Sequence, residues 1–182
     1  MKRNKFLALL NLLKLIKMPR EKAEPRIGFA RKQARILLKR ANITKPPILL
    51  RDVIVYLQKD NDIQVRAWNL GKKVSGIQAI EDGTSFIAYN VTQHQHRQRF
   101  SVAHEIGHFV LGHTAPKNFD YEPGNNDSYE TEAFSFAAEL LMPLNMIKKD
   151  YIEIHDPNSM AWKYFVSQEA MWKHLLELHI IK

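Results

Sequence analysis

Two histidines four residues apart, with a glutamate directly after the first, are the residues of this chain best suited to chemistry: His104, Glu105 and His108. On a helix, residues four apart lie on one face about one turn apart, so their imidazole nitrogens can bind one Zn²⁺ ion. Glu105 then lies beside the open coordination position, where a carboxylate can take a proton from water and deliver it to a leaving amine. The segment therefore predicts a zinc-dependent peptidase. The alternative is a pair of surface histidines on an amphipathic helix.

The residues around this segment favour the metal site over surface histidines. Phe100, Ala103, Gly107 and Val110 give the helix an apolar face that can be buried. A glycine inside a helix costs about 1 kcal/mol relative to alanine, so it usually has a packing or functional reason. At Gly107 we expect that reason to be the close approach of a strand or of a substrate backbone.

The composition restricts which atoms can hold a metal. The chain has no cysteine, so it has neither a disulfide framework nor a thiolate-bound zinc site. The ligands must then be histidines and carboxylates. These ligand types favour Zn²⁺, with Mn²⁺ and Fe²⁺ as alternatives.

A catalytic zinc site needs a third protein ligand. His113 is one place out of step with the spacing in which a third histidine follows ten residues after the first, so we reject it as a ligand and expect a polar cap. Glu130 lies within roughly 50° of the centre of the apolar face of a predicted helix over 129–141, where an unpaired carboxylate would be costly. We therefore expect Glu130 to be a ligand, the alternative being a carboxylate that only favours the helix N-terminus. Glu132 and Glu139 are expected to be solvated.

The rest of the pattern predicts an α+β domain that positions these residues. The apolar spacing of residues 30–41 and of about 49–59 predicts two helices, separated by Pro46-Pro47. Alternating apolar residues predict three short strands, interpreted as a small antiparallel sheet, over 63–67, 76–80 and 85–89. After Asn90 the pattern is helical to the end, apart from a loop over 114–127, so an active-site helix and C-terminal helices follow the sheet.

The 182 residues and their 45% hydrophobic content suit one compact domain, assigned to residues 26–182, after a basic amphipathic extension over residues 1–25. The extension is too short and too charged to span a bilayer and has no signal-cleavage site, so we expect a cytoplasmic protein without a stable membrane span. The net charge of +8 is interpreted as solvated helix faces. Direct nucleic-acid binding is the least favoured reading, because no reading helix or aromatic platform is recognisable.

Two segments together resemble the ImmA/IrrE family of metallo-endopeptidases. They are the run Arg99 to His108, and Glu130 to Ala133 followed by Phe136 to Pro143. The similarity covers roughly residues 26–181 and includes Pro46-Pro47, Ser75-Gly76 and a late segment over 166–171. The resemblance implies a zincin-like fold with His104, His108 and Glu130 as metal ligands and Glu105 as the general base.

The resemblance also implies a protein substrate. Known members cut transcriptional repressors of mobile elements or stress genes, often a helix-turn-helix partner. Many relatives carry such a domain at their own N-terminus, for which residues 1–25 are too short, so we expect a separately encoded repressor. The alternative function is a metal-containing module that binds a regulator without cutting it, although Glu105 argues against that reading. An oxyanion-stabilising residue is left unassigned, the candidates by type being Tyr121, Tyr129, Tyr151, His155 and His174.

Overall fold

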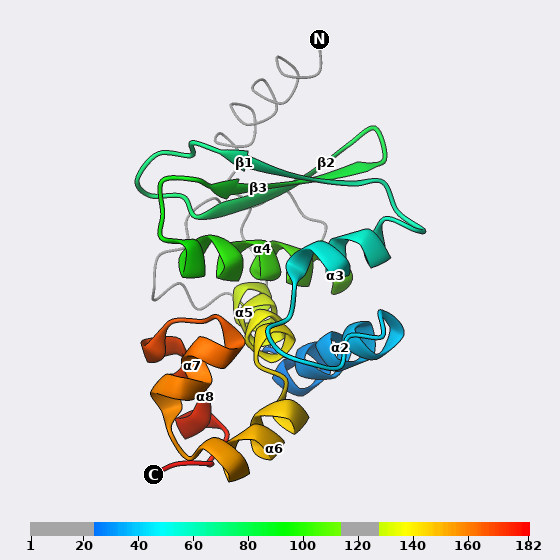
Figure 1. Ribbon diagram of the computed structural model, residues 1–182. Helices are drawn as coiled ribbons and strands as arrows, with labels where there is room; N and C mark the ends of the chain where they lie inside the picture. The colour runs from blue at the N-terminus through cyan, green and yellow to red at the C-terminus, as the bar shows by residue number, and fades with distance from the viewer. Residues whose placement is uncertain (1–23, 114–127) are drawn as a thin grey trace.

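The computed structural model describes residues 24–113 and 128–182, which form seven helices and one three-stranded sheet (Figure 1). The fold class is therefore α+β, as predicted. Two helices precede the sheet and five follow it. In chain order the elements are α2 (Ile27–Arg40), α3 (Leu50–Leu57), β1 (Ile63–Trp68), β2 (Gly76–Glu81), β3 (Thr84–Asn90), α4 (Gln95–Val110), α5 (Ser128–Leu141), α6 (Leu144–Ile154), α7 (Pro157–Tyr164) and α8 (Gln168–Glu177).

The sheet is mixed rather than antiparallel, so the prediction of an antiparallel sheet was wrong for one strand. Strand β3 lies in the centre, and it pairs antiparallel with β2 but parallel with β1. The chain leaves β1 at Trp68 and returns along β2 on the other side of β3. Asn90 holds this link, because its buried side-chain amide donates to the carbonyl of Val74 at 2.8 Å. Alternation of apolar residues identifies strands, but it carries no information about their direction.

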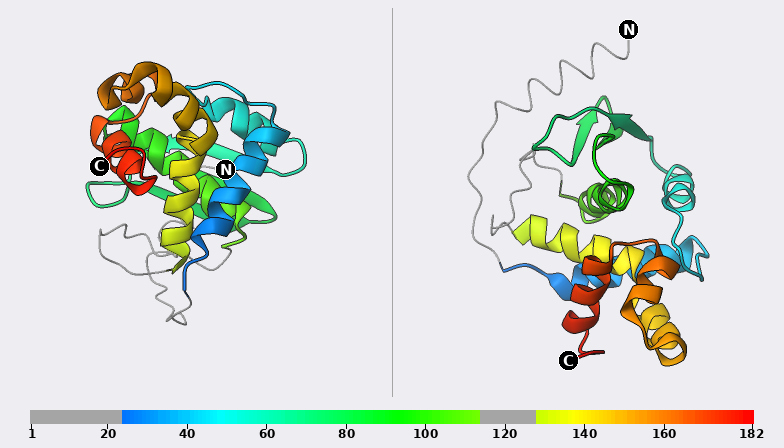
Figure 2. Two further views of the ribbon diagram at one scale, coloured as in Figure 1. Left: turned by 90° about the horizontal axis from the view of Figure 1, so that it is seen from below. Right: turned by 60° about the vertical axis from the view of Figure 1, so that its left-hand side comes forward.

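Helix α4 is the middle layer of the molecule, between the sheet and α5. It contacts β2 and β3 on one side and α5 on the other, while α2 packs along α5. The view in which α4 is seen end-on shows it directly under the sheet and above α5 (Figure 2). Apolar side chains that are fully buried join these layers to the C-terminal helices, among them Ile106, Phe136, Leu140, Ile147 and Met160.

Several expectations concern residues that the structure does not describe. The helix expected near residues 1–18 and the loop expected over 114–127 both lie outside the described ranges. Within 24–113 and 128–182, no helix combines the length and the apolar character needed to cross a membrane.

Candidate metal centre

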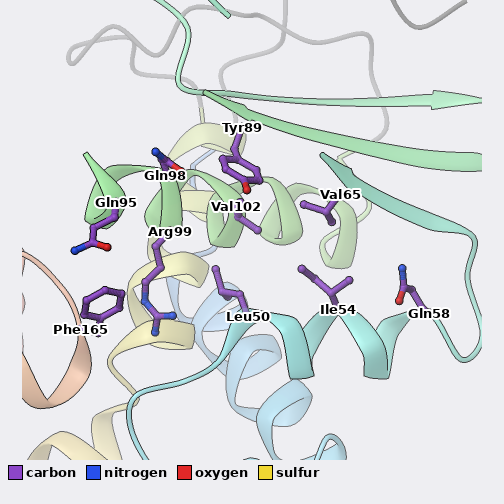
Figure 3. A pocket seen from close by; sticks show the side chains of 10 residues that line it. All are labelled: Leu50, Ile54, Gln58, Val65, Tyr89, Gln95, Gln98, Arg99, Val102 and Phe165. Carbon is purple, nitrogen blue, oxygen red and sulfur yellow. The ribbon is translucent and has the colours of Figure 1, made fainter. Parts of the chain in front are cut away.

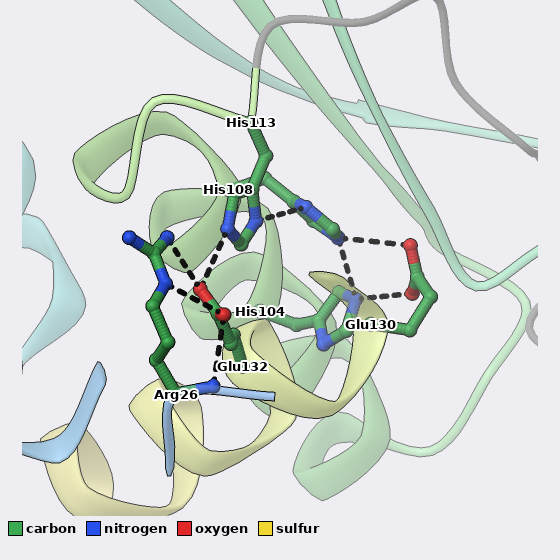
Figure 4. A network of polar contacts seen from close by, with 6 residues as sticks. All are labelled: Arg26, His104, His108, His113, Glu130 and Glu132. Atoms are coloured by element: carbon green, nitrogen blue, oxygen red, sulfur yellow. Dashed lines mark hydrogen bonds and ion pairs between the residues drawn. The ribbon is translucent and has the colours of Figure 1, made fainter. Parts of the chain in front are cut away.

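Helices α4 and α5 bring two histidines and one carboxylate together (Figure 4). The Nε2 atoms of His104 and His108, one turn apart on α4, are 3.0 Å from each other. Glu130, in the first turn of α5, places its Oε2 atom 3.0 Å from His104 Nε2 and its Oε1 atom 3.2 Å from His108 Nε2. The sequence-predicted ligands therefore converge on one point, although they come from segments that are 22 residues or more apart.

The donor set suits a divalent metal ion. One ligand atom from each of His104, His108 and Glu130 lies within 4.8 Å of the other two. Ligand atoms that surround one ion at about 2.0–2.2 Å are themselves separated by about 3–3.5 Å, which is close to the spacing seen here. Two imidazoles and one carboxylate also leave one position open on a four-coordinate ion. These three residues could hold a metal.

The charge of Glu130 agrees with this use. Burial by itself would raise the pKa of the Glu130 carboxyl, but its hydrogen bonds with His104 and His108 outweigh that effect and hold the pKa far below its ordinary value. Glu130 is therefore ionised at neutral pH. An ionised carboxylate is the form that binds a cation.

Gly107 explains how α5 comes so close to the two histidines. A Cβ atom at this position would lie 3.1 Å from the carbonyl oxygen of Ala133 and 3.1 Å from Cδ1 of Phe136. The missing side chain therefore makes room for α5, and not for a strand or a substrate backbone as we expected. Helix α5, which carries Glu130, can pack this closely on α4 beside His108 because residue 107 has no side chain.

Glu105 points towards the sheet, away from the direction in which α5 lies. Its side chain is buried under the start of β2, where a Cβ atom at Gly76 would lie 2.9 Å from Glu105 Oε1. Gly76 thus makes the space that this carboxylate occupies. No pattern in the sequence links Gly76 to Glu105, apart from the Ser75-Gly76 pair that belongs to the family resemblance.

Three further residues, His113, Glu132 and Arg26, form a polar network next to His108. The sequence analysis assigned none of them to the site. The ring of His113 is buried, with Nδ1 3.0 Å from His108 Nδ1 and Nε2 3.1 Å from Glu132 Oε2. Glu132 in turn accepts hydrogen bonds from the backbone N–H of Arg26 at 2.9 Å and from its guanidinium at 3.0 Å. His113 does close the helix end through its backbone N–H, which donates to His108 O. Its ring, however, is part of the buried network and not a solvated cap.

Glu132 and Glu139 are both buried, so the expectation that they are solvated was wrong. Glu139 is fully buried, pairs with Arg35 at 3.0 Å and accepts from the backbone N–H of Leu144. The physical reason is that α4 packs on one side of α5 and α2 on another. Glu139 therefore meets a cation of α2, Arg35, and Glu132 meets Arg26, the N-cap residue of that helix.

Burial would raise the pKa of the Glu132 carboxyl. Hydrogen bonds from the side chain and backbone of Arg26, and from His113, outweigh this effect, so the pKa is lowered overall. Glu132 therefore carries a full negative charge at neutral pH, and it can only accept hydrogen bonds.

The residues considered for oxyanion stabilisation remain unassigned. The ring of Tyr129 stacks on His113 with centroids 4.4 Å apart. His174 is buried and contacts the carbonyl of Met142 at 2.9 Å, which is a structural role. Tyr151 and His155 contact each other at the end of α6, and Tyr121 lies outside the described residues.

A separate hollow of about 490 Å³ opens on the α3 side of α4 (Figure 3). Arg99 points into it and donates to the carbonyl of Ile48, and burial lowers its pKa to about 10, so it stays charged at neutral pH. The sequence analysis did not predict this hollow. It is lined by Leu50, Ile54, Gln58, Val65, Tyr89, Gln95, Gln98, Arg99, Val102 and Phe165.

A His–His–Glu centre between two helices, under a small mixed sheet, is an arrangement expected of a peptidase domain that can bind a metal. Comparison with known proteins identifies the family. Residues 58–175 match the Peptidase M78 family, described as an IrrE N-terminal-like domain. The chain therefore belongs to this family, and the resemblance found in the sequence is confirmed.

Two individual relatives extend the comparison. The chain is 34% identical over 84 residues to a protein named "Uncharacterized immunity region protein 2" from Bacillus phage phi105, an alignment that covers 45% of this chain and 53% of that protein. The chain thus spans about half the length of this curated relative. A solved structure titled "Mycobacterium tuberculosis transcriptional regulator" superposes with a TM-score of 0.54 over 79% of this chain and 45% of that one, at 11% identity. At that identity the likeness concerns the fold alone.

Proposed function

We propose that this protein is a zinc-dependent endopeptidase with a zincin-like catalytic domain, in which His104, His108 and Glu130 bind the metal and Glu105 is the general base. The observation that carries the proposal is the convergence of three ligand atoms, from α4 and α5, within 4.8 Å of one another. Glu105 follows the first ligand directly on the same helix and has a buried carboxylate. Membership of a peptidase family supports the same assignment.

Each residue has a distinct part in this mechanism. A bound zinc ion supplies a Lewis acid, which lowers the pKa of coordinated water to about 7. His104, His108 and Glu130 would hold the ion. Glu105 takes a proton from the attacking water and passes it to the nitrogen of the leaving amine. Glu105 is buried under the start of β2, where the absence of a side chain at Gly76 leaves room for its carboxylate.

The substrate that we propose is a separately encoded helix-turn-helix transcriptional repressor of a mobile element or a stress response. The phage relative carries the words "immunity region protein" in its name, which supports a role connected with a mobile element. The family membership supports a protein substrate in the same way.

The proposal is tested with Glu105→Gln, which keeps the size of the side chain and all three proposed ligands. Helix-turn-helix proteins encoded near this chain's gene are tested as substrates. Cleavage is followed by mass spectrometry, and bound metal is measured in the same samples. We expect the variant to keep its metal and to cleave more slowly by about 10²–10⁴-fold, the usual contribution of a general base.

Two outcomes would contradict the proposal. A Glu105→Gln protein that cleaves at the wild-type rate would exclude the assigned mechanism. A wild-type protein that binds metal and inhibits the repressor in a one-to-one ratio, with no cleavage product, would favour a module that only binds its regulator.

A further inference from the structure

A chain of polar contacts runs from the buried His108 to Arg26, the N-cap residue of α2 (Figure 4). His108 Nδ1 contacts His113 Nδ1 at 3.0 Å, and His113 Nε2 contacts Glu132 Oε2 at 3.1 Å. Arg26 donates to both oxygens of Glu132, from its backbone N–H and Nε to Oε1 and from Nη2 to Oε2. His108 uses its second nitrogen, Nε2, to face His104 and Glu130. Both nitrogens of His108 therefore have separate tasks.

The direction of these hydrogen bonds follows from the contacts. Glu132 accepts from the backbone N–H and the guanidinium of Arg26, with which it forms an ion pair, so it is an acceptor and His113 Nε2 carries the hydrogen of their bond. The Nδ1 atom of a neutral His113 is then an acceptor, and His108 Nδ1 must carry the hydrogen of the bond between the two rings. In a neutral His108 this leaves the lone pair on Nε2, the atom that faces Glu130, so a metal ion bound between them would take the place of the proton that otherwise joins the two groups. The network thus selects the tautomer that can bind a metal through Nε2.

The same residues also fix the plane of the rings. The ring of Tyr129 stacks on His113 at an interplanar angle of 28°. Tyr129 directly precedes Glu130, so a single turn of α5 supplies both a proposed ligand and the support for His113. A ring held on one face and bonded at both nitrogens has no free rotation.

We propose that His113 and Glu132, anchored by Arg26, are positioning residues that fix the tautomer and orientation of His108 and so determine the affinity of the centre for its metal. The inference rests on the part of the proposed function that makes His108 a ligand, and it does not require peptidase activity. Partners of this kind, which hydrogen-bond to a metal-binding histidine, typically change metal affinity by about 10–100-fold when they are removed.

The main test replaces His113 with phenylalanine, which keeps the stacking on Tyr129 but removes both ring nitrogens. The matched control is His174→Phe, because His174 is equally buried but contacts Met142 in the C-terminal half of the fold. Zinc affinity is measured by competition with a chromogenic chelator, and the folded state of each protein is checked by circular dichroism. We expect His113→Phe to weaken zinc binding by about 10–100-fold, whereas His174→Phe keeps the wild-type affinity.

A second measurement uses the wild-type protein and so does not depend on a variant that folds. Long-range ¹H–¹⁵N spectra of the zinc-loaded protein identify which nitrogen of each imidazole carries a hydrogen. We expect the hydrogen on Nδ1 in His108 and on Nε2 in His113. The opposite tautomer in His113 would overturn the inference.

The other outcomes separate this inference from the proposed function. If folded His113→Phe binds zinc as tightly as the wild type, the positioning role is wrong, while the metal site and the peptidase remain. If the wild type binds no metal, both proposals fail. If His113→Phe loses affinity but the wild type cleaves no repressor, the positioning role stands and the peptidase proposal fails.

Discussion

The contact between α4 and α5 at Gly107 can be tested with a single methyl group. In Gly107→Ala the new Cβ would lie 3.1 Å from the Ala133 carbonyl oxygen, 3.1 Å from Phe136 Cδ1 and 3.3 Å from Ala133 Cα. Carbon atoms in contact prefer about 3.5–4.0 Å, so α5 must move away from α4 by several tenths of an ångström. Glu130 lies one turn before Ala133 on α5, so the shift would also move this carboxylate relative to His104 and His108.

The expected change in stability is the difference between two opposing effects. Overpacking of a well-filled interior typically costs about 1–3 kcal/mol. Replacing a helix glycine by alanine returns about 1 kcal/mol. The net expectation for Gly107→Ala is a free energy of unfolding that is lower by about 0–2 kcal/mol. The control is Gly28→Ala in the first turn of α2, where the new Cβ meets nothing within 4 Å.

Urea unfolding of the three proteins, with and without zinc, measures both effects. We expect Gly28→Ala to be at least as stable as the wild type and to bind zinc equally well. Gly107→Ala should be less stable than Gly28→Ala by about 1–3 kcal/mol, and its zinc affinity should fall. If Gly107→Ala were as stable as Gly28→Ala and bound zinc like the wild type, the reasoning about the close helix contact would be refuted.

Two further predictions concern Glu105 and a buried histidine. In Gly76→Ala the new Cβ would lie 2.9 Å from Glu105 Oε1, so the carboxylate must move. Because a misplacement of about 1 Å can cost about 10²-fold in rate, we expect cleavage to slow. Zinc affinity, measured by chelator competition, should stay at the wild-type value. Burial lowers the pKa of His174 from its usual 6.5 despite the hydrogen bond to Met142, so the folded state binds its proton less readily than the unfolded state. The free energy of unfolding should therefore fall as pH drops below 6.5, by up to about 1.4 kcal/mol per pH unit. Urea titrations at several pH values should show a smaller dependence of this free energy on pH for His174→Phe than for the wild type. An equal dependence in both proteins would contradict the prediction.

The sequence predicted the parts of the site that depend on local spacing. His104 and His108 are four residues apart, so any helix through them places both on one face. The apolar face of α5 could also be read from its own residues, and this was sufficient to turn Glu130 inward. Both inferences use one helix at a time, and the structure brings the three side chains together as they anticipated.

The sequence could not predict features that depend on which elements become neighbours. The periodicity of α5 suggested that the side carrying Glu132 and Glu139 faces solvent. Because α2 and α4 both pack against α5, these two carboxylates are buried instead. The contact of Glu132 with Arg26 joins residues 106 apart, a separation that no local pattern encodes. The direction of β1 likewise depends on the path of the chain around β3 and not on the residues of β1 itself.

The hydrogen bond from the backbone N–H of Arg26 to Glu132 connects local unfolding at the start of α2 with the histidines of the centre. Helix ends fray readily, and the first turn of a helix has backbone N–H groups without partners inside the helix. In this protein, one such group at the start of α2 holds the carboxylate that supports His113. Unwinding of this turn would expose a charged group that is otherwise 2% accessible and would loosen the histidines behind it. Local unfolding at the start of α2 and release of the ion are therefore expected to be one coupled event.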